Sequence, residues 1–112
     1  MGENMKEKRL GKIDFAEFGL MKDYPFLIGL QLGFSMNGTG VMDGGKYTVN
    51  ISSGCKWENN NREETITRSV ETVEQILKAA KVHYVSQLIG KPVEVTVVDH
   101  CFQDFRILTE VL

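Results

Sequence analysis

The chain has 112 residues, of which 42% are hydrophobic and 25% are charged, and its formal net charge is -2. These values are ordinary for a globular chain of one domain. No apolar run is long enough for a transmembrane helix, and the N-terminal residues contain no apolar signal segment. The net charge gives no overall attraction to phosphate backbones or anionic membranes, although it is compatible with a local basic patch. We therefore expect a cytoplasmic protein that does not bind membranes.

The first segment is polar, and the apolar pattern starts after it. Residues 1–9 have mixed charges and no periodicity, so we predict a flexible arm before a single domain over residues 10–112. Residues 10–20 are predicted to form the first strand. The apolar face of this segment changes sides near Glu17, which indicates a bulge there.

Residues 26–36 form the stretch around which the rest of the chain is organised. Every second position is apolar, which is typical of a strand with one buried face. The residues between these positions are mainly small or polar. We predict the central strand of the only core here, with six inward side chains: Phe26, Ile28, Leu30, Leu32, Phe34 and Met36.

Residues 37–45 contain four glycines, and we predict a long loop rather than a tight hairpin turn. Alternation resumes over residues 46–51, which are predicted to form a third strand that pairs with the second. The polar segment 52–61 is predicted to be a second loop.

The period then changes to that of a helix over residues 62–81, with Asn61 as its N-cap. Residues 93–98 and 105–111 alternate again and are predicted to be the last two strands. The predicted class is α+β: a mainly antiparallel, curled sheet of five strands in the order β-β-β-α-β-β, with one long amphipathic helix packed on it as the main source of order. The same order fits an oligonucleotide-binding (OB) barrel, so both closed and open sheets remain alternatives. The predicted helix stripe is Ile66, Val70, Val73, Leu77 and Ala80.

The glycine-rich loop is the first candidate for a site. It matches neither a Walker loop nor a dinucleotide fingerprint, because its spacing differs and no helix follows it. Glycines still allow backbone N–H groups to approach a ligand closely, so the alternatives are a flexible connection and a binding loop. Trp57 either caps the core or offers a ring to a base or a protein partner. The predicted ligand- or partner-binding residues are Asn37, Thr39, Lys46, Tyr47, Lys56 and Trp57.

Signals for catalysis or metal binding are weak. His83, His100, Cys55 and Cys101 lack the spacing of metal ligands. Adjacent residues of a strand point to opposite faces, so Asp99-His100-Cys101 does not indicate a catalytic dyad or triad. We therefore predict no catalytic residues, no metal, no cofactor and no enzymatic activity. The two cysteines are expected to be free thiols in a reducing compartment, and a disulfide between them is the alternative.

Three segments resemble small, uncharacterised proteins encoded by bacteriophages and prophages. They are Gly44-Gly-Lys-Tyr47, the Trp57 loop, and the tail from Gly90-Lys-Pro-Val-Glu-Val95 through Phe105-Arg-Ile-Leu-Thr-Glu-Val-Leu112. The resemblance covers most of the chain from about Gly11. It implies a phage setting, within the cytoplasm of a host cell. No activity is established for such proteins, so no site residues follow from it.

Three functions are compatible with these observations. The first is a non-catalytic binding protein, such as a counter-defence factor that sequesters a signalling nucleotide or inhibits a host protein. The second is an OB-like protein that binds single-stranded nucleic acid, which the net charge disfavours. The third is a structural or assembly subunit, and for this chain we expect a homo-oligomer. Its surface would combine Leu27, Val98, Leu108 and Leu112.

Overall fold

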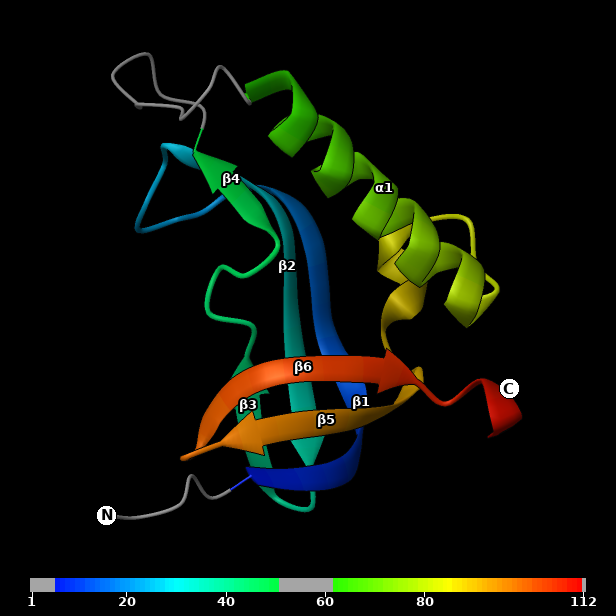
Figure 1. The fold of residues 1–112 in the computed structure, drawn as a ribbon. Coiled ribbons are helices and arrows are strands. Elements are labelled where there is room, and N and C mark those ends of the chain that lie inside the picture. Colours follow the sequence, from blue (N-terminus) through cyan, green and yellow to red (C-terminus); the bar gives the residue numbers. More distant parts are fainter. Residues whose placement is uncertain (1–5, 51–61, 112) are drawn as a thin grey trace.

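The computed structural model describes residues 6–50 and 62–111. Within these ranges the chain forms six strands, one α-helix and two short 3-10 helices (Figure 1). The α-helix and the 3-10 helices are α1 (Arg62–Ala80), η2 (Val85–Leu88) and η3 (Thr109–Val111). The strands are β1 (Lys6–Leu20), β2 (Leu27–Met36), β3 (Thr39–Met42), β4 (Thr48–Asn50), β5 (Pro92–Val98) and β6 (Cys101–Ile107).

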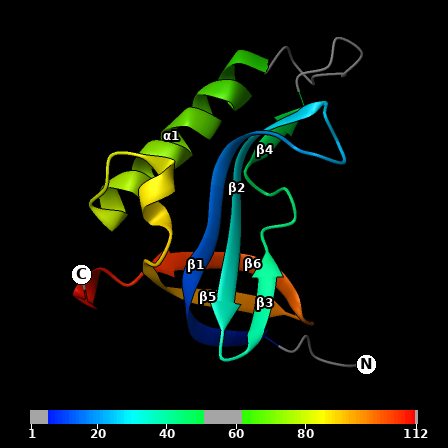
Figure 2. The ribbon, with the colours of Figure 1, turned by 180° about the vertical axis from the view of Figure 1, so that it is seen from behind.

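The strands form one antiparallel sheet in the order β3-β2-β1-β5-β6, and β4 pairs with β2 beyond the end of β3. The sheet curls so that β5 and β6 cross in front of β1, β2 and β3 (Figures 1 and 2). No ladder among the described residues joins β3 to β6, so the sheet does not close into a barrel. The predicted α+β class with a curled antiparallel sheet is confirmed, with six strands in place of five.

β1 belongs to both halves of the curled sheet. Its first part, from Lys6 to Lys12, pairs with β5, and its second part, from Lys12 to Leu20, pairs with β2. The ladder with β2 is irregular between Ile13 and Phe15. A bulge of this kind bends a strand, which allows one strand to serve two crossing layers. The bulge therefore lies earlier than the predicted position at Glu17. The strand also begins at Lys6, so residues 6–9 are not part of an arm.

β2 is the centre of the core, as predicted. Leu30, Leu32, Phe34 and Met36 are buried, and their side chains share one face of the strand. Phe26 differs from the prediction, because it precedes β2 and is 44% exposed. Gly29 lies on the outer face of β2. A Cβ atom at this position would lie 2.4 Å from the carbonyl oxygen of Tyr47 and would therefore collide with the backbone. A glycine is required there because β4 approaches so closely.

Two tight turns replace loops that were predicted to be longer. Asn37 and Gly38 have φ values of 47° and 86° and join β2 directly to β3. Asp99 and His100, with φ values of 51° and 67°, join β5 to β6 in the same way. Positive φ at both central residues is typical of type I′ hairpins, for which Asn-Gly is a strong signal. The prediction of a single loop over residues 37–45 was therefore wrong, and β6 begins earlier than predicted.

α1 is confirmed over nearly all of the predicted range, but its packing differs. Ala80 is its only fully buried residue, and the partly buried Val73, Ile76 and Leu77 contact the core from one face. Val70 is 58% exposed, so it does not belong to the inward stripe. Most fully buried side chains belong to the strands. The curled sheet, rather than the helix, is therefore the main source of order. None of the described helices is long and apolar enough to cross a membrane.

Candidate functional site

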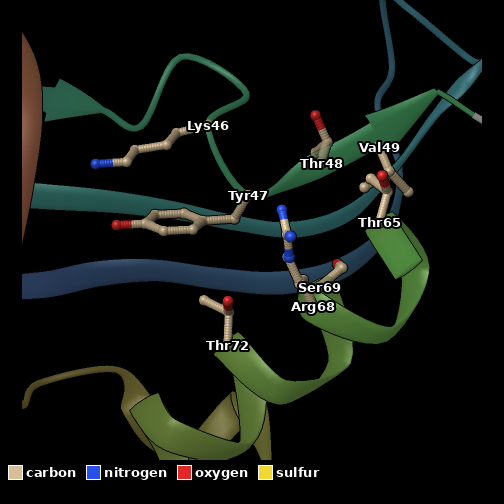
Figure 3. Close-up of a pocket in the computed structure, with 8 residues that line it drawn as sticks. All are labelled: Lys46, Tyr47, Thr48, Val49, Thr65, Arg68, Ser69 and Thr72. Atoms are coloured by element: carbon tan, nitrogen blue, oxygen red, sulfur yellow. The ribbon is translucent and has the colours of Figure 1, made fainter. Parts of the chain in front are cut away.

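A groove lies between α1 and two segments that face it, residues 46–49 and β6, and we call it the α1 groove. Its first part has a volume of about 220 Å³ and lies between the first turns of α1 and the segment that leads into β4 (Figure 3). Its second part, about 320 Å³, continues along α1 to β6. Tyr47 and Thr72 line both parts, so the two parts adjoin each other. The first part is lined by Lys46, Tyr47, Thr48, Val49, Thr65, Arg68, Ser69 and Thr72.

A turn held by Asp43 sets the position of the strand-side wall. Asp43 is 6% exposed, and its carboxylate accepts hydrogen bonds from the backbone N–H groups of Leu32 and Gly45, each at 3.0 Å. The backbone N–H of Asp43 in turn donates to the carbonyl of Leu32 at 3.0 Å. Gly44 and Gly45 follow with φ values of 67° and 82°, which glycine adopts readily. This turn places the next two residues, Lys46 and Tyr47, in the wall of the groove.

Tyr47 forms part of an aromatic cluster that spans the open side of the sheet. Its ring makes edge contacts with Phe102 and Phe105 of β6, with centroids 6.3 and 6.1 Å away. Both of those rings also pack on Phe34 of β2. Burial, together with the nearby negative charges of Asp104 and Asp43, raises the pKa of the Tyr47 phenol well above its ordinary value. The hydroxyl group therefore stays protonated at neutral pH and keeps its capacity to donate a hydrogen bond.

Lys46 is directed away from the helix and toward β6. Its ammonium donates to the carbonyl oxygen of Gln103 at 2.5 Å and lies 3.7 Å from the carboxylate of Asp104. It also lies 5.7 Å from the ring centroid of Phe102, within the range of a cation–π contact. Lys46 thus fastens the turn to β6 and is already engaged, which reduces its availability to a ligand.

Arg68 is the cation that points from α1 into the gap toward β4 (Figure 3). Its partner is Glu64, one turn earlier on the helix, and both side chains are largely exposed. An exposed pair of this type contributes less than about 1 kcal/mol, so a ligand can compete for the guanidinium at little cost. A guanidinium offers a planar set of donors that matches a phosphate or carboxylate group.

Hydroxyl groups surround the guanidinium. Thr65, Ser69 and Thr72 follow one another on the groove side of α1, and the structure shows no hydrogen bond from these side chains to another described residue. Thr48 lies on the opposite wall, where its hydroxyl donates to the carbonyl of Gly45 at 2.7 Å. Toward a ligand Thr48 is therefore an acceptor, whereas the helix hydroxyls can donate or accept.

The structure brings together only part of the predicted site. Lys46 and Tyr47 line the α1 groove, whereas Asn37 and Thr39 line a different cavity beside the first part of β1. Lys56 and Trp57 lie outside the described residues, as does Cys55. Cys101 is exposed and free. Leu27, Val98 and Leu108 are each partly buried, and Leu112 lies outside the described residues.

Sequence reasoning missed the helix wall of the groove. No residue of α1 was among the predicted binding residues. The signal that would have found them is their spacing, since residues 65, 69 and 72 are four and three positions apart and so share one helix face. That face adjoins the apolar residues Val73 and Ile76 rather than the charged side of the helix.

The described residues contain no group of three or more His, Cys, Asp or Glu side chains that would hold a metal ion. The first part of the groove offers hydroxyl groups, the guanidinium of Arg68 and the ring of Tyr47, which are the means of binding a small polar anion. No family model, curated protein or solved structure matches this chain.

Proposed function

We propose that the protein is a non-catalytic binding protein whose α1 groove takes a small phosphorylated ligand of the nucleotide class. The observation that carries this proposal is the position of Arg68, which projects into a cavity walled by hydroxyl groups and by the Tyr47 ring. A guanidinium and hydroxyls suit a phosphate, and an aromatic ring suits a base or sugar. The two parts of the groove together fall in the range of about 300–1,000 Å³ that is typical of small-molecule sites.

The resemblance to phage proteins gives this activity a setting. A phage protein that binds a nucleotide without consuming it would sequester the molecule from host signalling, in the role of a counter-defence factor. Inhibition of a host protein is the competing form of the same proposal. The groove favours the small ligand, because hydroxyl groups of both walls surround the Arg68 guanidinium in its first part.

A thermal-shift panel tests the ligand class. We expect mononucleotides or cyclic dinucleotides to raise the melting temperature, because a ligand at 100 times its dissociation constant stabilises the folded state by about 2.7 kcal/mol. Adenosine without phosphate and inorganic phosphate alone are the comparison ligands, and both are expected to give smaller shifts. If no nucleotide stabilises the protein at millimolar concentration, the proposal is wrong.

Arg68→Ala is expected to weaken nucleotide binding about tenfold or more, because a hydrogen bond to a charged group contributes about 1.5–3 kcal/mol. Isothermal titration calorimetry with the nucleotide that gives the largest thermal shift measures the change. Lys78→Ala is the matched control. Lys78 forms an i,i+4 pair with Glu74 just as Arg68 does with Glu64, and their side chains are 75% and 73% exposed, but Lys78 does not line the groove. Equal losses in the two variants would show that the helix charge, and not the groove, determines affinity.

A further inference from the structure

The first part of β1 presents a row of lysines, and we call it the β1 lysine row: Lys6, Lys8 and Lys12. These residues are exposed and share one face of the strand with Leu10, which is 64% exposed. The alternate residues face the other way, where Arg9 pairs with Glu7 at 2.8 Å. In Figure 1 this part of β1 lies at the end of the molecule opposite the first turn of α1, so the row is separate from the α1 groove.

The positive charge of the row is not neutralised by its neighbours. None of the three lysines forms an ion pair with a described residue. The adjoining strand β5 carries one carboxylate, that of Glu94, which is paired with Leu10 in the ladder and is already bound to Arg106 at 3.2 Å. Asp104, one strand further on, lies 3.7 Å from the ammonium of Lys46. A chain of net charge -2 therefore carries a local strip of uncompensated positive charge.

The geometry of the row suits an extended polyanion. Alternate residues of a strand lie about 6.6–6.8 Å apart, which is similar to the separation of successive phosphates in an extended single strand. Leu10 lies between Lys8 and Lys12 and offers apolar surface to a sugar or base. Beside the row is a cavity of about 410 Å³, which Lys8, Arg9 and Leu10 line together with Asn37 of the β2–β3 turn and Thr39 of β3.

We propose that the β1 lysine row binds the phosphate backbone of an extended single-stranded nucleic acid, with the side-chain amide of Asn37 beside it as a hydrogen-bond donor. The Thr39 hydroxyl already donates to the Met36 carbonyl at 2.8 Å. The row contains no aromatic ring on which bases would stack, so this binding is independent of base sequence and of moderate strength. It is distinct from nucleotide binding in the α1 groove, because the two sites share no residue.

The size of the electrostatic effect follows from the number of lysines. Each phosphate contact releases counterions, and for single strands the slope of log K against log salt is about -0.7 per contact. Three lysines therefore predict a slope of about -2. Between 50 and 200 mM salt the affinity is expected to fall by a factor of about 20.

The experiment measures binding of the full-length protein to a fluorescein-labelled oligothymidine by fluorescence anisotropy at several salt concentrations. The test variant is Lys6→Gln/Lys8→Gln/Lys12→Gln. The control variant is Lys22→Gln/Lys78→Gln/Lys81→Gln, which also removes three exposed lysines and gives the same net charge. We expect the test variant to bind at least tenfold more weakly at 50 mM salt with a slope near zero, whereas the control variant keeps the slope of the parent protein.

Three results would overturn the proposal, and the third concerns a duplex. The first is no binding of the parent protein at low salt. The second is an equal loss of affinity in the two triple variants, which would show that overall charge rather than the row attracts the strand. A duplex of the same length is the comparison ligand, and tighter binding to the duplex would contradict an extended single strand as the partner. Circular dichroism of both variants establishes that loss of binding does not reflect loss of folding.

Discussion

Phe34→Ala is expected to lower the free energy of unfolding by about 3–5 kcal/mol, the usual cost of truncating a buried phenylalanine. Phe34 is 1% exposed and lies near the end of β2. Its ring stacks on Phe102 with centroids 5.2 Å apart and contacts Phe105 at 5.0 Å. Because no ladder joins β3 to β6, these ring contacts hold the two halves of the curled sheet together across its open side.

Urea denaturation followed by circular dichroism measures this change. Phe18→Ala is the matched control, since Phe18 belongs to β1 and is 52% exposed, and we expect it to cost less than about 1 kcal/mol because surface substitutions have small effects. The loss of stability in Phe34→Leu is expected to fall between those of Phe34→Ala and Phe18→Ala, because leucine retains part of the buried volume. If Phe34→Ala and Phe18→Ala destabilise the protein equally, the ring cluster does not hold the sheet together.

Asp43→Ala is expected to lower the free energy of unfolding by about 2–4 kcal/mol. Each hydrogen bond to the charged carboxylate contributes about 1.5–3 kcal/mol, and the two contributions are not fully additive because both bonds belong to one turn. The substitution leaves the buried N–H of Leu32 without an acceptor and releases the turn at Gly45. Asp43→Asn is expected to be destabilising as well. It preserves the shape but replaces one acceptor oxygen by a donor that faces a backbone N–H.

The control for Asp43→Ala is Asp23→Ala, which removes an exposed carboxylate from the turn before β2 and is expected to change stability by less than about 0.5 kcal/mol. Nucleotide binding gives a second readout. Since Asp43 positions Tyr47 at the groove, Asp43→Asn is expected to weaken nucleotide binding even under conditions in which it remains folded. A folded Asp43→Asn variant with the affinity of the parent protein would show that this turn does not set the geometry of the site.

The elements that sequence predicts best here are those with strong periodicity. β2 alternates over its whole length, and α1 changes the period to that of a helix, so both were located to within a few residues. The two type I′ turns were missed for different reasons. Asn37-Gly38 carries a strong local signal that was hidden by the glycines following it, whereas Asp99-His100 carries a much weaker signal.

The site depends on contacts that local patterns do not encode. Lys46 meets the carbonyl of Gln103 because the sheet curls, and the two residues are 57 positions apart in the chain. The bulge between Ile13 and Phe15, near the point where β1 passes from its pairing with β5 to its pairing with β2, was predicted several residues too late. Arg68 was missed because an arginine on a helix is usually solvated, and only the position of α1 beside β4 shows that it projects into a groove.

The β1 lysine row also depends on a contact that its own sequence does not encode, namely the pairing of β1 with β5. Residues 6–9 were interpreted as an arm because their charges are mixed and no apolar residue interrupts them. Pairing with β5 makes them a strand, and only as a strand do Lys6 and Lys8 fall on the same face as Lys12. The buried Val93, Val95 and Val97 of β5 supply the apolar side of this pairing, so the partner strand carries the pattern that β1 lacks.

The most direct test of the α1 groove is a titration of the 15N-labelled protein with the nucleotide that gives the largest thermal shift, followed by amide chemical shifts. The account predicts that the largest changes fall on Tyr47, Thr48, Ser69 and Thr72, which form the two walls of the groove. Saturation of these changes at a single dissociation constant is also expected. Changes centred on the β1 lysine row, or changes spread evenly over the chain with no saturation, would contradict a nucleotide site between α1 and β4.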